Sequence, residues 1–295
     1  MLGYGAVPDD AEWRTRVFSW LDLRLAETGG ALSRDELLGD RPPMKLLDRS
    51  RGIRNPAELA STLSIMSSPD GPYDDHDVED GLFRYAVREG DPLGGDNRKL
   101  HSALRRRDPM VLLRRLEPGT YVPYYPVYAV GVDLVRRHFL IALDPSLRYA
   151  DDAVLATIDK GYAARLTRQR LHQPVFRSQV LTAYDRRCAM CRLAHVPLLD
   201  AAHITADSEA DGDAVVTNGL ALCKIHHAAY DRDIIGVSPD RVVVVDADVL
   251  RGVDGPMLRH GIQALHGQGL HLPDDPRQHP DRDRLERRFA AFRSR

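Results

Sequence analysis

The stretch 188–231, CAMCRLAHVPLLDAAHITADSEADGDAVVTNGLALCKIHHAAYD, decides the fold of the second half of this 295-residue chain. It begins with a C-x2-C pair, Cys188 and Cys191, and near its end carries a C-x2-H group, Cys223 and His226. Three cysteines and a histidine at these spacings predict one tetrahedral Zn²⁺ site. The 31 residues between Cys191 and Cys223 exceed the roughly 12 to 20 of a plain zinc knuckle pair and leave room for two strands and a loop. We therefore expect the zinc to close over an inserted hairpin.

The doublet of His226 and His227 places two histidines side by side after Cys223. If this segment is helical, adjacent side chains diverge by about 100°, so the two imidazoles cannot bind one metal ion. The C-x2-H spacing assigns His226 to zinc. His227 is then free for a second site, which we expect it to share with His203.

Other interpretations of the three cysteines are weaker. Ordinary buried thiols would rarely fall into two groups of this spacing. Disulfides are disfavoured because the cysteine count is odd and no apolar signal segment precedes the acidic stretch at 9–12. A zinc deaminase needs H-x-E and P-C-x-x-C motifs, and the sequence has neither.

Read in order, His203, Asn218 and His227 form a pattern that resembles the HNH (ββα-metal) nucleases. In that family a zinc clip closes the hairpin and helix that hold a nucleic-acid cleavage site. Phosphodiester hydrolysis needs a water deprotonated on one side of the phosphorus and a Lewis acid on the other. The resemblance implies that His203 is the general base and that His227 binds a catalytic Mg²⁺ or Mn²⁺. It also implies that Asn218 pins the loop so that the base is aimed correctly.

The first ligand of the catalytic metal departs from the family pattern. Many HNH enzymes carry a ligand directly before the base histidine, but Ala202 occupies that position here. In a strand, Asp200 and Ala202 share one face and His203 lies on the other, so we take Asp200 as the candidate ligand. Asp231, one helical turn after His227, is predicted either to orient that imidazole or to be a solvated helix residue.

A second resemblance lies in the middle of the chain, over residues 45–145. The residues that carry it are Tyr73-Asp74-Asp75-His76-Asp77, Asp80-Gly81, Phe83, Tyr85 and Asn97-Arg98-Lys99-Leu100. They resemble the SRA (YDG) domain, which flips a modified cytosine out of duplex DNA. The resemblance implies that two tyrosines stack on the extruded base and that an aspartate accepts from its exocyclic amine. The predicted base-binding residues are thus Tyr73, Asp74, Asp75, Asp77, Tyr85 and Asn97.

This second segment departs from its family in two ways. Gly71-Pro72 stands where the family has a glycine pair, and the acidic run is shifted by one residue. The identity of the base-reading aspartate therefore stays open among Asp74, Asp75 and Asp77. The alternative interpretation is an acidic surface loop between two strands, with tyrosines that belong to the core.

The charge distribution is uneven, although the formal net charge is only −2. Basic residues cluster over 98–115 and again over 160–187, and such local clusters indicate a phosphate-binding face. Four of the 41 basic residues are Lys and the rest are Arg, which suits bidentate phosphate contacts but follows equally from a GC-rich genome. No apolar run is long enough to predict a membrane span. The predicted DNA contacts are Arg98, Arg105, Arg106 and Arg107.

The length predicts about two domains in an α+β protein. Apolar spacing predicts a helix over 10–25 and a helix N-cap at Ser33, and β-rich runs occur at 61–66, 82–87, 122–132, 138–143 and 241–245. We expect three segments: an SRA-like (PUA-like) β-barrel with flanking helices over 1–145, a helical basic connector over 146–172, and an HNH module with structural zinc over 173–295.

Together the two resemblances predict a modification-dependent DNA endonuclease of the type IV restriction kind in a bacterial cytoplasm. Its partner would be double-stranded DNA that carries 5-methyl- or 5-hydroxymethylcytosine, because a sequence-blind nuclease would destroy the host genome. Since one HNH site cuts one strand, we expect a homodimer. Two alternatives stay open: an HNH nickase or homing-type nuclease that reads unmodified sequence, and a non-catalytic zinc-stabilised DNA reader.

Overall fold

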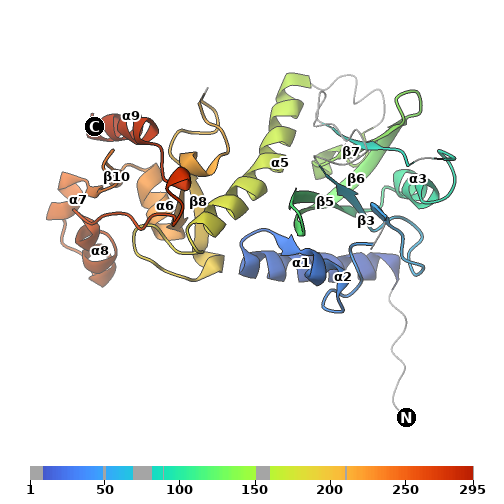
Figure 1. The fold of residues 1–295 in the computed structure, drawn as a ribbon, viewed down its shortest axis with the longest axis horizontal. Helices are drawn as coiled ribbons and strands as arrows, with labels where there is room; N and C mark the ends of the chain where they lie inside the picture. Colours follow the sequence, from blue (N-terminus) through green and yellow to red (C-terminus); the bar gives the residue numbers. More distant parts are fainter. Residues whose placement is uncertain are drawn as a thin grey trace, which may run out of the picture. The chain divides into compact units, whose positions relative to one another are not determined.

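The computed structural model describes residues 9–48, 51–68, 82–88, 90–150, 160–209 and 211–294, and only the backbone of 160–168. The chain forms two compact units. Unit 1 comprises Met1–Leu25 with Gly30–His172, and unit 2 comprises Ala26–Gly29 with Gln173–Arg295. Helix α5, Lys160–Ala183, continues across the boundary between His172 and Gln173 (Figure 1).

Unit 1 is built on a curled sheet with strand order β2-β3-β5-β6-β7-β4, in which β1 pairs with β6. Among the described strands, β3 and β5 pair in parallel and the other neighbours are antiparallel. The long strand β6 pairs with β5 through its first half and with β7 through its second, which curls the sheet into a half-barrel. The strands are β1 Leu32–Ser33, β2 Ile53–Arg54, β3 Ser64–Ser67, β4 Phe83–Ala86, β5 Met110–Glu117, β6 Thr120–Asp133 and β7 His138–Ala142.

The sheet and its helices confirm the predicted α+β class. The β-rich runs predicted in the first half of the chain coincide with β3, β4, β6 and β7. Strand β5 is not among the predicted strands, because Arg114 and Arg115 give its sequence the character of a basic cluster. Its first half, Met110 to Leu113, is buried in the structure and forms a central strand.

Among the described residues, unit 1 has helices α1 Asp10–Thr28, α2 Arg34–Leu38 and α3 Asn97–Arg106, and it also includes the first part of α5. Val17 and Leu21 of α1 are fully buried in a cluster that includes Tyr121 of β6. The predicted N-cap at Ser33 is confirmed. Its hydroxyl accepts from the Glu36 backbone N–H at 3.2 Å, and the Glu36 carboxylate accepts from the Ser33 N–H at 3.0 Å, a reciprocal capping box.

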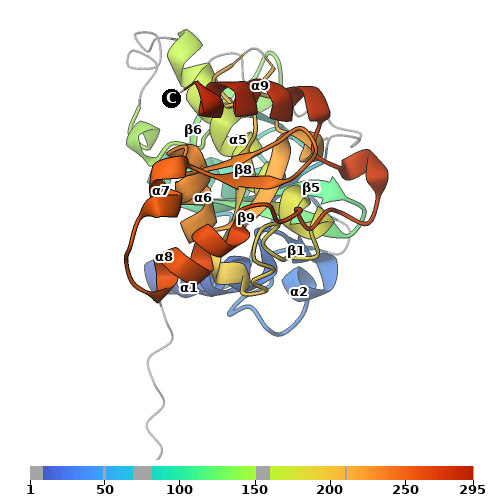
Figure 2. The ribbon, with the colours of Figure 1, turned by 90° about the vertical axis from the view of Figure 1, so that its left-hand side faces the viewer.

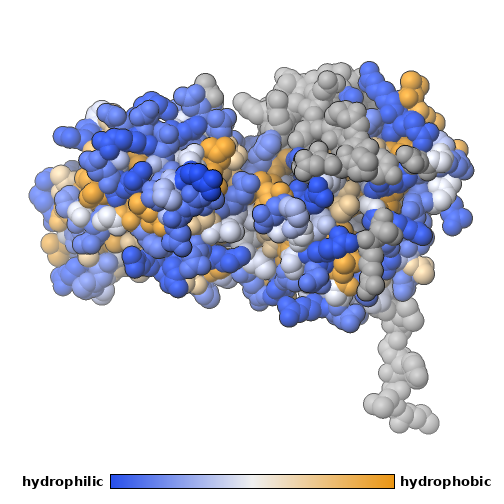
Figure 3. Space-filling view, in the orientation of Figure 1, coloured by the Kyte–Doolittle hydropathy of each residue, from blue (hydrophilic) through white to orange (hydrophobic). Residues whose placement is uncertain are grey.

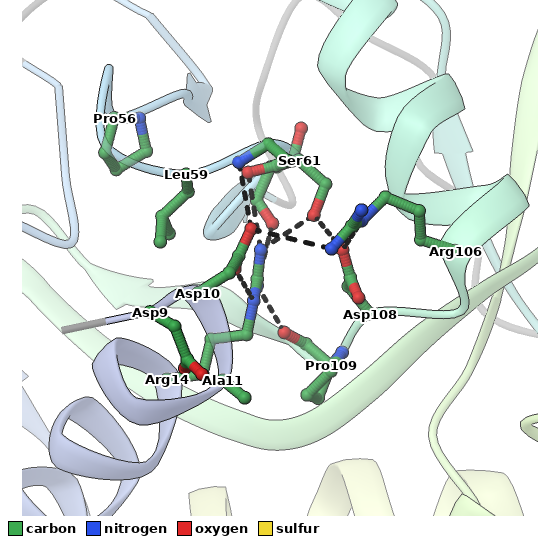
Figure 4. A network of polar contacts seen from close by, with 12 residues as sticks. Asp9, Asp10, Ala11, Arg14, Pro56, Leu59, Ser61, Arg106, Asp108 and Pro109 are labelled. Atoms are coloured by element: carbon green, nitrogen blue, oxygen red, sulfur yellow. Dashed lines mark hydrogen bonds and ion pairs between the residues drawn. The ribbon is translucent and has the colours of Figure 1, made fainter.

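A buried guanidinium, that of Arg14, fastens α1 to the segments beside the sheet (Figure 4). Its Nε donates to Asp10 at 2.7 Å and its Nη2 donates to the Ser61 hydroxyl at 2.7 Å. The Ser61 hydroxyl and the Nε of Arg106 both donate to Asp108 at 2.6 Å. Because a buried charge is tolerated only when it is paired and hydrogen-bonded, this network is structural, and Arg106 belongs to it.

Unit 2 contains a hairpin of β8, Leu199–His203, and β9, Gly219–Cys223, which is followed directly by helix α6, Lys224–Asp231 (Figure 2). The strands are antiparallel, with His203 opposite Gly219 and Asp200 opposite Leu222. Helix α6 contacts both strands. Buried side chains from α5, the turn after it, the hairpin and α6 contribute to the core, among them Phe176, Val180, Tyr184, Ala202, Leu220, Leu222 and Tyr230.

The remaining elements of unit 2 add buried side chains to the same core, among them Ile235, Val243, Ile262 and Leu285. A second hairpin pairs Ile235 with Val245, and its second strand lies within the predicted run 241–245. The elements are β10 Ile235–Val237, β11 Val243–Val245, α7 Ala247–Arg251, α8 Pro256–Gly261 and α9 Arg282–Arg293. The 3-10 turns within the described residues are η1 Pro145–Leu147, η2 Val196–Leu198, η3 Val216–Asn218, η4 Gln263–Leu265 and η5 Pro276–Gln278.

The surface carries mainly hydrophilic side chains on the face that Figure 3 shows, with apolar ones scattered among them. Within the part of the chain that the structure describes, no helix combines the length and the apolar character that crossing a membrane requires.

Candidate functional site

A cluster of three cysteines and one histidine joins the start of the hairpin module to its helix. Cys188 and Cys191 come from the turn after α5, Cys223 ends β9, and His226 lies in the first turn of α6. Their ligand atoms all lie within 4.8 Å of one another, and the His226 Nδ1 stands 3.4 Å from the Cys188 sulfur and 3.3 Å from that of Cys223. Ligands of one tetrahedral zinc stand about 3.3 to 3.8 Å apart, because each lies about 2.0 to 2.3 Å from the ion. The cluster can therefore hold zinc.

The orientation of His226 suits this role. Its Nε2 lies 2.7 Å from the backbone carbonyl of Gly261, at the end of α8. Since a carbonyl only accepts, Nε2 donates this hydrogen bond, which leaves Nδ1 facing the sulfurs and available to a metal ion. The sequence holds no signal for this partner, because Gly261 contributes only a backbone carbonyl and lies 35 residues away.

The crowded sulfurs also perturb one another. Contact with Cys188 lowers the pKa of Cys223 and raises that of Cys191. The thiols cannot all lose their protons together without a compensating positive charge. A bound cation would supply that charge.

His227 faces a different set of partners from its neighbour His226. Its Nδ1 lies 3.7 Å from the Asp200 carboxylate of β8, and its Nε2 lies 3.4 Å from the Asp231 carboxylate one turn further along α6. The side chains are partly exposed, 23% for His227 and 44% for Asp200. The structure thus separates the two adjacent histidines and brings His227 to Asp200. Asp231 lies where a carboxylate that orients His227 would lie.

His203 ends β8, and its imidazole stacks on the ring of Phe176 from α5. Burial lowers the pKa of His203, and the nearby His227 lowers it further, while Asp207 and Asp231 act in the opposite direction. The imidazole is therefore neutral, and able to accept a proton, over a wider range of pH than an exposed histidine. Its Nε2 is enclosed and has no hydrogen-bond partner among the described residues.

Asn218 is fully buried and holds the loop that follows His203. Its side-chain oxygen accepts from the Thr205 N–H at 2.9 Å, and its side-chain nitrogen donates to the carbonyls of Thr205 and Asp213, each at 3.0 Å. In addition, the Ile204 N–H donates to the Asn218 carbonyl at 2.9 Å. These bonds fix the backbone immediately after the candidate base.

Two further residues approach the site from elements that sequence analysis does not connect with it. Arg177 of α5 places its Nε 3.4 Å from the Asp200 carboxylate and donates to the Leu199 carbonyl at 2.9 Å. From the C-terminal side, the Asp281 N–H donates to the Thr217 carbonyl at 2.9 Å, next to Asn218. The sequence marks Arg177 only as a member of a basic cluster, and no local pattern indicates the contact of Asp281.

The predicted base pocket of unit 1 is described only in part. Tyr73, Asp74, Asp75 and Asp77 lie outside the described residues. Tyr85 is 1% exposed; its hydroxyl donates to the Gly52 carbonyl at 3.0 Å and receives a hydrogen bond from Arg88 at 3.0 Å. Asn97 is 2% exposed and bonds to the backbone of Arg88 and Asp91. Both side chains are thus held inside unit 1, and their contact with a base stays a prediction.

The four predicted DNA-contacting arginines differ in their surroundings. Arg98 and Arg105 on α3 are exposed. Arg106 is engaged by Asp108 at 2.6 Å. Arg107 has a left-handed backbone conformation with φ 55°. Its guanidinium donates to the carbonyls of Ala129 and Ala150, so this side chain links segments within unit 1. Arg98 and Arg105 are therefore the two members of the predicted set that are best placed to meet DNA.

Comparison with known protein families supports the resemblance of unit 2 to the HNH nucleases. A family model described as HNH endonuclease matches residues 188–238, which span the cysteine cluster, both strands of the first hairpin and α6. A comparison with curated proteins found no match.

Solved structures that resemble the chain do so weakly. A modification-dependent TagI restriction endonuclease is 17% identical, with 82% of this chain and 85% of that chain covered and a TM-score of 0.31. An SUVH5 SRA complex with methylated CHH DNA is 21% identical over 40% and 89%, with a TM-score of 0.28. The type IV phosphorothioation-dependent restriction endonuclease ScoMcrA is 16% identical over 62% and 48%, with a TM-score of 0.24.

Proposed function

We propose that this chain, an endonuclease whose residues 188–238 form its HNH domain, is modification-dependent: unit 1 reads a modified cytosine and unit 2 hydrolyses the DNA backbone. The observation that carries the nuclease half is the convergence of His203, Asn218, His227 and Asp200 on one hairpin and helix, beside a separate zinc-type cluster. The reader half rests on the resemblance of residues 45–145 to the SRA domain.

His203 acts as the general base in this proposal. Its lowered pKa keeps the imidazole neutral near pH 7, which is the state that accepts a proton from the attacking water. Asn218 keeps the backbone after His203 in place through its bonds to Thr205. A loss of either contribution should affect the rate of cleavage more than the affinity for DNA.

Asp200 and His227 are the residues that would hold the catalytic Mg²⁺ or Mn²⁺. Their nearest ligand atoms lie 3.7 Å apart, both side chains reach solvent, and a carboxylate with an imidazole suits either ion. When bound, the ion would supply Lewis-acid stabilisation of the leaving oxygen. Asp231 orients the His227 imidazole from the other ring nitrogen. Ala202, which stands where many HNH enzymes have a ligand, is fully buried and offers none.

The cluster of Cys188, Cys191, Cys223 and His226 would hold a structural Zn²⁺. All four donors are protein side chains, and four such donors would fill the coordination sphere of a tetrahedral zinc, which would leave no open position for substrate. The zinc would fasten the turn after α5 to the end of β9 and the start of α6. Such a metal would shape the nuclease module and would take no part in hydrolysis.

A plasmid assay tests the function. Purified protein is incubated with matched supercoiled plasmids that are unmodified, cytosine-methylated or cytosine-hydroxymethylated, in Mg²⁺ and separately in Mn²⁺. We expect cleavage of at least one modified plasmid and none of the unmodified one, and His203→Ala should abolish it. Equal cleavage of all three plasmids would favour an HNH nuclease that reads unmodified sequence. Absence of cleavage, with DNA binding retained, would favour a non-catalytic reader.

A further inference from the structure

The imidazole of His203 lies face to face with one aromatic ring, that of Phe176 on α5. The ring centroids are 4.0 Å apart and the planes differ by 17°. Phe176 is 2% exposed and belongs to the core cluster of unit 2. It lies outside residues 188–238, so the family match does not include it.

The approach of Phe176 depends on a glycine directly opposite His203. Gly219 pairs with His203 in the hairpin register. A Cβ added at Gly219 would stand 3.0 Å from the Cζ of Phe176 and 2.4 Å from a methyl of Val180, distances too short for ordinary packing. Helix α5 can therefore come this close to the hairpin because position 219 carries no side chain.

Hydrogen bonding from the described residues does not fix the His203 ring at its enclosed end, since Nε2 has no partner there. The second side-chain torsion of histidine is intrinsically broad, so packing must set the plane of the ring. Stacking on Phe176 does so, because rotation of the imidazole out of this plane would collide with the neighbouring ring. A general base works only within about 2.6 to 3.2 Å of the proton that it removes, so a defined ring plane matters for the rate.

We propose that Phe176 is a positioning residue for hydrolysis: it holds the plane of the His203 imidazole, and Gly219 provides the space that this contact needs. The inference rests on the proposed role of His203 as general base. It assigns to Phe176 a part in catalysis separate from its contribution to the core. If Phe176 only filled the core, its loss would cost stability and leave the rate of the folded enzyme unchanged.

Two substitutions on α5 separate the possibilities. Phe176→Leu removes the ring and keeps an apolar side chain, and Leu181→Ala removes bulk from the same helix and the same core, where it is also buried. Both should lower the melting temperature. On a cytosine-methylated plasmid with Mn²⁺, Phe176→Leu should lower kcat by about 10- to 100-fold with KM and zinc content unchanged, because small misplacements of catalytic groups cost this much. Leu181→Ala should keep the wild-type kcat below its melting temperature. Equal kcat for both variants and the wild type would overturn the proposal.

A second measurement does not depend on cleavage. In protein with ¹³C-labelled histidine, the ring protons of His203, assigned from their loss in His203→Ala, should be shifted upfield by the Phe176 ring current. That shift should disappear in Phe176→Leu and persist in Leu181→Ala. A His203 signal at its ordinary position in the wild type would overturn the stacking and with it the proposal. A wild-type protein that shows the upfield shift but cuts no plasmid would count against the proposed nuclease function alone.

Discussion

Replacing His226 or His227 by alanine should cause two different failures, although the residues are adjacent on α6. His226 is 3% exposed, faces two cysteine sulfurs through Nδ1 and donates to the Gly261 carbonyl through Nε2. His227 is 23% exposed and lies between the carboxylates of Asp200 and Asp231. His226→Ala therefore removes a proposed zinc ligand, and His227→Ala removes a candidate ligand of the catalytic ion.

The expected losses of folding stability differ between the two variants. Structural zinc in small modules contributes about 10 to 16 kcal/mol at neutral pH, and a whole domain is stable by only about 5 to 15 kcal/mol. The Gly261 carbonyl, left without its donor, adds roughly 1 to 3 kcal/mol to the loss. We thus expect unit 2 of His226→Ala to be unfolded at 25 °C. Removal of the partly exposed His227 should change stability by no more than about 0.5 kcal/mol, the usual range for surface substitutions, and should abolish cleavage.

The assay combines metal content by mass spectrometry, thermal unfolding by circular dichroism and plasmid cleavage for the two variants and the wild type. The expected pattern is no zinc and a lost transition for His226→Ala, against one zinc per chain, a wild-type melt and no cleavage for His227→Ala. A folded, zinc-containing His226→Ala would refute the assignment of ligands. Loss of zinc in His227→Ala would show that the two histidines have been exchanged.

Three other outcomes follow from the same geometry. Because burial holds the pKa of His203 below its ordinary value, cleavage by the wild type should decline with falling pH only below about pH 6.5. His203→Ala should cleave about 10²- to 10⁴-fold more slowly, and a plot of its residual log kcat against pH should lack this decline at acidic pH. Exchange of the exposed Arg98 and Arg105 for glutamine should weaken binding to modified and unmodified duplexes alike, as measured by fluorescence anisotropy at several salt concentrations. The slope of log affinity against log salt concentration should become shallower by about one for each phosphate that the variant no longer neutralises. Gly219→Ala should destabilise unit 2 by about 1 to 3 kcal/mol in urea unfolding, since its Cβ would press on Val180 and Phe176, and an unchanged midpoint would contradict the close approach of α5.

The parts of the site that could be predicted from the sequence depend on short-range geometry. A C-x2-C and a C-x2-H group each place their own two ligand atoms within reach of one ion, and the structure brings the two groups together. Adjacent helical positions diverge in the same way in any protein, so His226 and His227 could be separated in advance. The one-turn spacing of His227 and Asp231 likewise brings their side chains together, at 3.4 Å.

The parts that could not be predicted depend on contacts between distant segments. Nothing local to Phe176 or Arg177 indicates that α5 will lie against the hairpin, and the hydrogen bond from His226 to Gly261 forms only after α8 has packed. The basic cluster on α3 shows the same limit. Its residues all carry the same charge, but the side chain of Arg107, at the C-cap of α3, donates hydrogen bonds to backbone carbonyls of unit 1. Composition alone does not distinguish such an arginine from an exposed one.

The predicted base-binding residues of unit 1 also depend on contacts between distant segments. Tyr85 is fully enclosed, with its hydroxyl bonded to Gly52, so Tyr85→Ala would remove core packing as well as any stacking on a base. A loss of binding in that variant could not be attributed to the base contact. The stacking prediction is therefore also tested with Tyr73→Ala, and each variant is compared with the wild type at equal folded fraction. Stacking contributes about 1 to 3 kcal/mol per base, and only the affinity for modified duplex should fall by this amount.

The central claim is that cleavage depends on a modified base, and one measurement tests it most directly. Two synthetic duplexes of identical sequence, which differ only in one 5-methyl- or 5-hydroxymethylcytosine, are cut under single-turnover conditions with Mn²⁺, with His203→Ala as the control for contaminating nucleases. We predict that the duplex carrying one of these bases is cut at a defined distance from it, that the unmodified duplex stays intact, and that His203→Ala cuts neither. Equal rates on modified and unmodified duplexes, both lost in His203→Ala, would leave the nuclease site in place and contradict the dependence on modification.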